Sequence, residues 1–375
     1  MYVKKSKRIA VPPDMAKPIL FFADKHWPEV GGMETHADQF ISHFDNCEDY
    51  PLLGVVTKAA DGSDLLVRNG RTARLDLGSD DLNPVQIVFH NSGRWIESFG
   101  RLRQRFKNAF HVYRTGGNEI AKASLTASAP ACHRERQLIW AREINVHIDL
   151  LITNSSFTES RLKSQGVSCE FLRVVGGVGP ARPRPTKLPG GAIRLFCAAR
   201  FVPYKNHATL IAVMKLLLAA GHRVELRMAG DGPLIEEMKR EASPYSTHGE
   251  MVFLGKIPNE RVMQEIGEAD YYLQFSTELR VDVPGGSYLH AEGMGRSILE
   301  AIAAGVFVIA LDTGALSEIV TPSRGRLLPA RARPEQLSDL IGQIIKDGPH
   351  APRPTDEFNW HQVFSSYKRR WQDAF

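Results

Sequence analysis

Cysteine is scarce in this chain, and the few cysteines lie far apart. Among 375 residues there are four, at Cys47, Cys132, Cys169 and Cys197. They form neither a CxxC pair nor a cysteine/histidine spacing typical of zinc ligands. This pattern argues against a disulfide-rich secreted domain and against a structural zinc site, and it favours a reducing compartment.

Long apolar runs are absent as well. The first apolar run, ILFFA at 19–23, follows a proline and is too short for the core of a signal peptide. No stretch approaches the roughly 20 apolar residues that a membrane-spanning helix needs. We therefore predict a soluble, cytoplasmic protein without a membrane span.

Positive charge is in slight excess, and most of the excess lies at one end. The formal net charge is +5, and residues 1–17 alone contribute +4. The remaining chain is nearly neutral, so a nucleic-acid partner is not predicted. We expect 1–17 to be a flexible basic tail; a contact of this tail with phospholipid or with an acidic partner is the alternative.

The length favours two domains, because one ordinary core rarely serves 375 residues. A segment rich in proline and glycine, GPARPRPTKLPGG at 179–191, cannot continue a strand or a helix for long. We predict a tail at 1–17, an N-terminal domain at 18–180, a linker at 181–191, a C-terminal domain at 192–350 and a final segment at 351–375.

Short apolar runs alternate with helical patterns along both halves. This alternation predicts two parallel sheets covered by helices, an α/β fold. The predicted strands are 18–23, 84–90, 109–115, 147–155, 192–199, 223–230, 250–255, 270–276 and 306–312. The clearest predicted helices are 207–221, 233–242, 260–269 and 334–348, and a further helix begins at the diglycine of 31–32.

The C-terminal segment carries an aromatic stripe. Trp360, Val363, Phe364, Tyr367 and Trp371 recur at helical spacing. Such a stripe requires a surface on which to pack, and the helices of the second domain are already accounted for. We therefore expect this helix to pack elsewhere.

Ligands of open parallel sheets bind beyond the carboxyl ends of the strands, so the residues that follow each strand are candidates for a site. PEVGGMETH at 28–36 places Gly31 and Gly32 before a helix, which suits either an anion or a plain tight turn. AARFVPYKN at 198–206 places Arg200 and Lys205 on one loop. These two cations form either a diphosphate clamp or a pair of solvated charges.

Two further stretches contain glycine turns. GDGPL at 230–234 lacks the third glycine of a dinucleotide fingerprint, since Ile235 stands there, and we reject NAD binding. HAEGMGRSILEA at 290–301 places Glu292 before a turn and Glu300 about one turn into a helix. With a phosphate at the start of this helix, Glu300 can reach an adjoining ribose, and Glu292 can reach the group on the other side of the phosphate. The alternative is a capped helix whose acids face solvent.

Taken in order, these stretches resemble the retaining glycosyltransferases of family 4, over about residues 18 to 320. That family has the GT-B fold of two facing Rossmann-like domains, with a C-terminal helix that crosses back to the N-terminal domain. EGMGRSILE matches its Glu-x7-Glu signature, and RFVPYK resembles its Arg-x4-Lys clamp. AGDGPL, VFLGKIPNE and TGALSEIV resemble further landmarks.

The resemblance implies a role for each matching position. Arg200 and Lys205 would neutralise the diphosphate, Glu300 would bind the ribose, and Glu292 would hold the transferred sugar. No metal is expected, because two cations and a helix end replace it. The remaining donor-binding candidates are Gly31, Gly32, Lys256, His290, Gly293, Met294 and Gly295.

Two departures from the family concern sugar contacts. The family often has a histidine where this chain reads YRTGGNEIA at 113–121, so Asn118 or Glu119 would stand in. Glu34 is a further candidate for an acceptor or sugar contact. The stretch 277–291 is long, and we expect it to form an active-site loop that ends at His290.

The expected activity is transfer of a sugar from a nucleoside-diphosphate sugar to an acceptor hydroxyl, with retention of configuration and without a cofactor. A UDP-sugar is favoured over a GDP-sugar on family frequency. The acceptor is a small molecule, a glycan or a lipid-linked sugar. A GT-B sugar-nucleotide epimerase and a non-catalytic sugar-binding protein are the alternatives.

Overall fold

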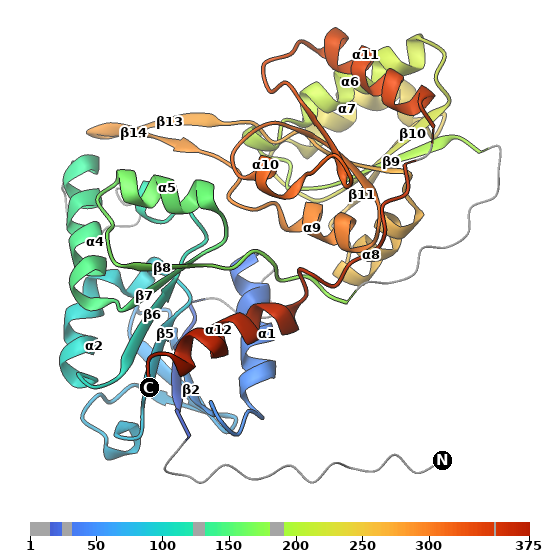
Figure 1. The fold of residues 1–375 in the computed structure, drawn as a ribbon. Coiled ribbons are helices and arrows are strands. Elements are labelled where there is room, and N and C mark those ends of the chain that lie inside the picture. Colours follow the sequence, from blue (N-terminus) through green and yellow to red (C-terminus); the bar gives the residue numbers. More distant parts are fainter. Residues whose placement is uncertain (1–15, 25–31, 123–131, 181–190, 349) are drawn as a thin grey trace, which may run out of the picture. The chain divides into compact units, whose positions relative to one another are not determined.

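The computed structural model describes residues 16–24, 32–122, 132–180, 191–348 and 350–375 (Figure 1). The predicted tail up to residue 15, Gly31 and most of the predicted linker lie outside these ranges. The chain forms two compact units. Unit 1 comprises Met1–Thr153, Glu159–Arg173 and Tyr367–Phe375, and unit 2 comprises Asn154–Thr158 and Val174–Ser366.

Unit 1 is built on one eight-stranded sheet in the order β4-β3-β2-β1-β5-β6-β7-β8. Its central strand β1 is completely buried, which explains why this strand reads as a continuous apolar run. The four strands predicted for this half are present; β2, β8 and the antiparallel β3–β4 hairpin are additional. The bounds are β1 Ile19–Phe22, β2 Leu52–Lys58, β3 Asp64–Arg68, β4 Arg71–Arg74, β5 Ile87–His90, β6 Phe110–Arg114, β7 Leu150–Thr153 and β8 Glu170–Arg173.

Helices follow the strands of unit 1. The predicted helix after the diglycine is α1, and it buries Ala37, Phe40 and Phe44 on one face. The α-helices are α1 Gly32–Phe44, α2 Phe99–Arg105, α4 His133–His147 and α5 Ser156–Ser164, the last of which begins in unit 2. The short 3-10 segments are η2 Asp80–Leu82, η3 Gly93–Ser98 and η4 Ile120–Lys122.

Unit 2 has a six-stranded, wholly parallel sheet in the order β11-β10-β9-β12-β15-β16. All the strands predicted for this half are present, and β16 is additional. The strands are β9 Ile193–Ala198, β10 Val224–Ala229, β11 Met251–Gly255, β12 Tyr271–Gln274, β15 Phe307–Leu311 and β16 Gly325–Leu328. The helical elements are η5 Pro203–Lys205, α6 His207–Ala219, α7 Ile235–Ser246, α8 Asn259–Glu268, α9 Arg296–Ala303, α10 Leu316–Ile319 and α11 Pro334–Lys346.

The stretch 277–291, which we expect to form an active-site loop, contains regular secondary structure. Strands β13 Leu279–Val283 and β14 Gly286–His290 pair antiparallel and form a two-stranded sheet of their own (Figure 1). Apolar and polar residues alternate along β13, and Gly285 takes φ +77° in the turn. The turn chemistry and the period of two therefore favour a hairpin.

The end of α12 Trp360–Gln372, from Tyr367 onward, belongs to unit 1, as the resemblance implied, and the preceding part of the helix belongs to unit 2. Tyr367 and Trp371 are 1% and 0% exposed. The Trp371 ring lies 5.4 Å from that of Phe44, and the Tyr367 ring lies 5.8 Å from that of Phe89. Burial of these two large rings holds the end of α12 against α1 and β5.

No helix within the described ranges has both the length and the apolar character that crossing a bilayer demands.

Candidate functional site

Lys205 and Glu292 form an ion pair in unit 2, with the Lys205 ammonium bonded to Glu292 Oε2. Lys205 ends the turn η5 after β9, and Glu292 lies between β14 and α9. Their side chains are 14% and 15% exposed. Burial alone would lower the pKa of Lys205 and raise that of Glu292; the opposite charge reverses both shifts, so the lysine pKa is raised and the glutamate pKa is lowered. Both groups are therefore charged at neutral pH.

A chain of buried polar side chains ends on Glu292. Ser276 Oγ donates to Glu292 Oε2 at 3.2 Å, and Gln274 Nε2 donates to Ser276 Oγ at 2.6 Å. The Tyr272 hydroxyl lies 3.3 Å from Gln274 Oε1. Tyr272, Gln274 and Ser276 are at most 1% exposed. Sequence reasoning did not single out these residues, although they occupy alternate positions, two within β12 and Ser276 just after it.

The charge of Glu292 sets the direction of this chain. An ionised carboxylate can only accept, so the single proton of Ser276 must point at Glu292. The Ser276 oxygen then accepts from the Gln274 amide, which turns the amide oxygen toward Tyr272. Each hydrogen bond polarises the next one in the same sense, which strengthens the bond to the carboxylate.

Close backbone packing holds Glu292 in place. Gly314 takes φ +55°, and a Cβ at this position would lie 2.3 Å from the Glu292 carbonyl oxygen. The backbone N–H of Ala315 donates to that oxygen at 3.0 Å. Any side chain at Gly314 would displace Glu292. This glycine lies in the TGALSEIV stretch, to which sequence reasoning gave no specific role.

The turn after Glu292 leads into α9, which begins at Arg296 as predicted. Gly295 is the N-cap residue with φ +74°, and its backbone N–H hydrogen-bonds to Glu292 and helps to lower the pKa of that carboxyl. Met294 packs against the core beneath α9, while Gly293 is partly exposed. The N-terminus of α9 therefore lies beside the acid of the ion pair.

Glu300 occupies a different environment from Glu292. Its side chain is on α9, and the residue is 6% exposed. Asn259 Nδ2 donates to Glu300 Oε1 at 3.2 Å, and Arg296 Nε lies 3.7 Å from the same oxygen. Burial raises the pKa of Glu300 and outweighs these two contacts. The two acids of the motif are thus held by separate groups.

Arg200, Tyr204 and His290 are neighbours near the ion pair. Arg200 is exposed and donates to the Tyr204 hydroxyl at 2.9 Å. The Tyr204 ring centroid lies 4.0 Å from that of His290, the last residue of β14. Lys256 is exposed just after β11. The structure thus brings Arg200, Lys205, His290 and Glu292 together through the η5 turn.

Four of the predicted site residues lie in the described part of unit 1. Gly32 is the first residue of α1, and Glu34 lies in its first turn. Asn118 Oδ1 accepts from Arg161 at 3.3 Å. Glu119 accepts from Thr115 Oγ1 at 2.6 Å and from the backbone of residues 116 and 117 at 2.8 and 3.0 Å. These bonds fold the Glu119 carboxylate back onto its own loop.

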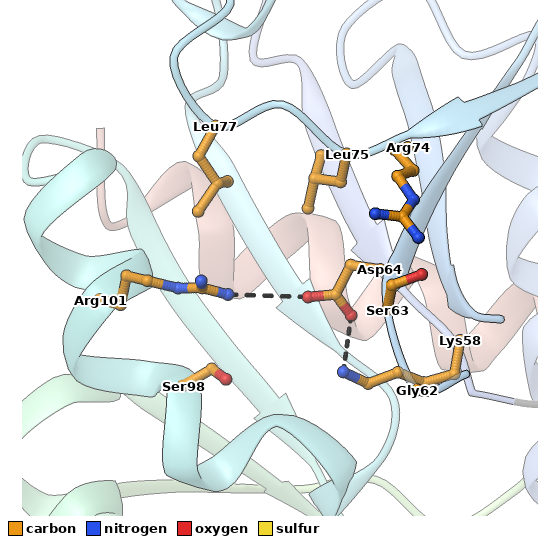
Figure 2. Close-up of a pocket in the computed structure, with 9 residues that line it drawn as sticks. All are labelled: Lys58, Gly62, Ser63, Asp64, Arg74, Leu75, Leu77, Ser98 and Arg101. Atoms are coloured by element: carbon orange, nitrogen blue, oxygen red, sulfur yellow. Dashed lines mark ion pairs between the residues drawn. The ribbon is translucent and has the colours of Figure 1, made fainter. Parts of the chain in front are cut away.

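Unit 1 also contains a hollow of about 460 Å³, shown in Figure 2. Lys58 lies 2.7 Å and Arg101 3.7 Å from the carboxylate of Asp64, to which Trp95 Nε1 also donates at 2.8 Å. Two of its basic groups therefore already face a carboxylate of the protein itself. The hollow is lined by Lys58, Gly62, Ser63, Asp64, Arg74, Leu75, Leu77, Ser98 and Arg101, none of which is a predicted site residue.

The sequence of this chain is similar to those of known glycosyltransferases. Residues 180–357 match the family model described as "Glycosyl transferases group 1". The chain is also 25% identical over 358 residues to the GDP-mannose-dependent alpha-(1-6)-phosphatidylinositol monomannoside mannosyltransferase of Mycobacterium tuberculosis, with 88% of this chain and 89% of that protein covered. These matches support a glycosyltransferase of the GT-B fold.

A second relative aligns with this chain over a smaller share of its own length. It is the GDP-mannose-dependent monoacylated alpha-(1-6)-phosphatidylinositol monomannoside mannosyltransferase of Corynebacterium glutamicum, 29% identical over 246 residues. The alignment covers 62% of this chain and 60% of that relative. Among solved structures, Anabaena HepE in complex with UDP and glucose aligns with a TM-score of 0.62 at 17% identity, covering 88% of this chain and 90% of that one. At that identity the likeness shows the fold alone.

Proposed function

We propose that this chain transfers a sugar from a nucleoside-diphosphate sugar to an acceptor hydroxyl, with retention of configuration. The observation that carries the proposal is the Lys205–Glu292 pair beside the N-terminus of α9. It combines a cation for a leaving diphosphate with a fixed acid for a sugar. A sugar-binding protein has no need of a charge placed to stabilise a departing group.

In this proposal Lys205 and Arg200 stabilise the diphosphate as it leaves. Glu292 holds Lys205 in a fixed position, so its ammonium needs little reorganisation to act on a leaving group. Arg200 is exposed and hydrogen-bonded to Tyr204. It is the second cation, and its guanidinium can bind the diphosphate through two N–H groups. The free N–H groups at the start of α9 favour the same negative charge.

The two acids divide the donor between them. Glu300 binds the ribose hydroxyls. Burial raises the pKa of its carboxyl, and hydrogen bonds from these hydroxyls would stabilise the ionised carboxylate. Glu292 accepts hydroxyls of the transferred sugar on Oε1, since Ser276 and Lys205 both bond to Oε2. Its role is to orient the sugar ring.

We further propose that retention arises by front-face displacement. The bond between the anomeric carbon and the leaving phosphate oxygen breaks, and its electron pair goes to that oxygen. An oxocarbenium-like centre forms, the acceptor oxygen attacks it from the same side, and the acceptor's hydroxyl proton passes to the departing phosphate oxygen. Positioning and charge stabilisation then carry the catalysis. Lys205 and Arg200 act on the leaving oxygen, and Glu292 keeps the ring in place.

For the donor we propose GDP-mannose. The names of the two relatives aligned above both specify GDP-mannose. The sequence-based preference for a UDP-sugar came from family frequency, which is weaker support than named relatives that align with 62% and 88% of this chain. Their names also favour a mannosylated phosphoinositide as acceptor.

A hydrolysis screen tests this function. The full chain is incubated with GDP-mannose, GDP-glucose, UDP-glucose or UDP-N-acetylglucosamine without acceptor, and release of the nucleoside diphosphate is measured. We expect slow release that is fastest from GDP-mannose and is lost in Lys205→Met. Release from a UDP-sugar alone would correct the donor, and calorimetry that detects no nucleoside diphosphate binding would refute the proposed function.

A further inference from the structure

Unit 1 places an arginine at the edge of its sheet where ligands bind. Strands β1, β5 and β6 are parallel neighbours, so their carboxyl ends meet. Arg114 is the last residue of β6, Asn91 follows β5, and Met33 lies in the first turn of α1. Arg114 belongs to unit 1, whereas the Lys205–Glu292 pair belongs to unit 2.

The guanidinium of Arg114 is held from several sides. Its Nη1 donates to Asn91 Oδ1 at 3.3 Å and to Met33 Sδ at 3.1 Å. The Asn91 amide in turn donates to the Met33 carbonyl at 3.0 Å. The hydroxyl of Tyr367 also hydrogen-bonds with Arg114. The protein's own side chains therefore fix the position of this arginine.

All of these partners are uncharged. Two arginines of comparable burial pair with carboxylates, Arg103 with Asp149 and Arg194 with Glu268, whereas Arg105 donates to backbone carbonyls and to an asparagine amide. Arg114 pairs with no carboxylate among the described residues. Glu119, on the loop after β6, uses both of its oxygens to bind that loop.

The surroundings of Arg114 do not supply a negative charge either. His36 hydrogen-bonds to Tyr367 at 3.0 Å, and burial lowers its pKa well below the usual value, with the charge of Arg114 as a second cause. The imidazole is therefore neutral at pH 7. A half-buried guanidinium without a counter-ion is expensive unless an anion joins it.

The donor count leaves room for such an anion. A guanidinium has five N–H donors, and three are used by Asn91, Met33 and Tyr367, so about two remain. Two N–H groups on one planar fork fit a phosphate bidentately. If Arg114 only joined α1 and α12 to β6, a neutral glutamine could make similar bonds without burying charge.

We propose that Arg114 is an anion site that binds a phosphate ester carried by the acceptor. The assignment of this anion to the acceptor rests on the proposed function, whereas the anion site itself does not. Because the acceptor is unidentified, the probes are glycerophosphoinositol, which carries a phosphodiester, and myo-inositol, which carries none. Both are soluble, so the charge is the main difference between them.

The experiment is calorimetry of both probes with the full chain and with three variants. We expect the wild-type chain to bind glycerophosphoinositol about 10–100-fold more tightly than myo-inositol, as one charge-assisted pair allows. Arg114→Met should abolish this preference, and Arg114→Lys should retain part of it. Arg142→Met, an exposed arginine of α4 in the same unit, should behave as wild type. Circular dichroism confirms that each variant is folded.

Two outcomes would overturn the proposal: equal affinity of the wild-type chain for both probes, or a preference that survives in a folded Arg114→Met variant.

Vesicles with and without phosphatidylinositol identify the source of the phosphate. Arg114-dependent binding to these vesicles assigns a lipid headgroup, and such binding to the soluble ester alone assigns a free phosphate ester. Calorimetry with GDP is run in parallel; loss of GDP affinity in Arg114→Met would place the arginine on the donor instead. Failure of the wild-type chain to bind GDP would count against the proposed function and leave the anion preference standing.

Discussion

Replacement of Ser276 by alanine tests whether the buried polar chain acts on Glu292. The mutation removes the hydroxyl that donates to Glu292 Oε2 at 3.2 Å and leaves the Gln274 amide without its acceptor at 2.6 Å. A hydrogen bond to a charged group contributes about 1.5–3 kcal/mol, and one pKa unit corresponds to about 1.4 kcal/mol. Because Lys205 and the Gly295 N–H still stabilise the carboxylate, we expect the pKa of Glu292 to rise by about one unit.

The sign of the effect on activity follows from that shift. The pKa of Glu292 is lowered in the folded protein, and the ionised form holds the sugar. A raised pKa therefore moves the acidic limb of the kcat/KM profile to higher pH by about one unit. At pH 7 we expect kcat to fall about tenfold or more, because the carboxylate is less firmly oriented. Affinity for the nucleoside diphosphate should be unchanged.

The assay is a pH profile of sugar transfer or of donor hydrolysis, together with calorimetry of the nucleoside diphosphate. Ser276→Thr keeps the hydroxyl and should restore the position of the acidic limb. Ser338→Ala is the matched control, because Ser338 is a 7% exposed serine of α11 in the same unit. An unshifted acidic limb in a folded Ser276→Ala variant would show that the chain stabilises the fold without acting on Glu292.

Three further predictions concern the same cluster. Glu300→Gln should weaken nucleoside diphosphate binding by about 1–3 kcal/mol, whereas Glu292→Gln should leave it nearly unchanged and lower kcat; equal losses in calorimetry would contradict the division of the donor. Lys205→Ala should lower kcat by about 10²–10³, and near-normal turnover in steady-state kinetics would remove Lys205 from the leaving-group site. Gly314→Ala should lower kcat and the free energy of unfolding by more than about 1 kcal/mol, measured by urea titration, because its Cβ would meet the Glu292 carbonyl.

The sequence by itself determined the class of fold and the order of its elements. Strands of a covered parallel sheet are buried on both faces, so they appear as short apolar runs between helical patterns. The candidate residues that follow these strands were also visible, because ligands of such sheets bind at the carboxyl ends. The start of α9 near Arg296 followed from glycine placement. The aromatic stripe indicated that the last helix needs a surface, and the family resemblance implied that this surface lies on the N-terminal domain.

Only the tertiary structure decided which residues meet. Lys205 and Glu292 are 87 residues apart, and they come together because β12 lies between β9 and β15 in the sheet. The same neighbourhood brings Ser276 to Glu292 and places Gly314 against its backbone. Sequence periodicity reports contacts between residues two to four positions apart, whereas strand order depends on how whole crossovers pack. Partners across the sheet, and the uncharged surroundings of Arg114, are therefore properties of the folded chain.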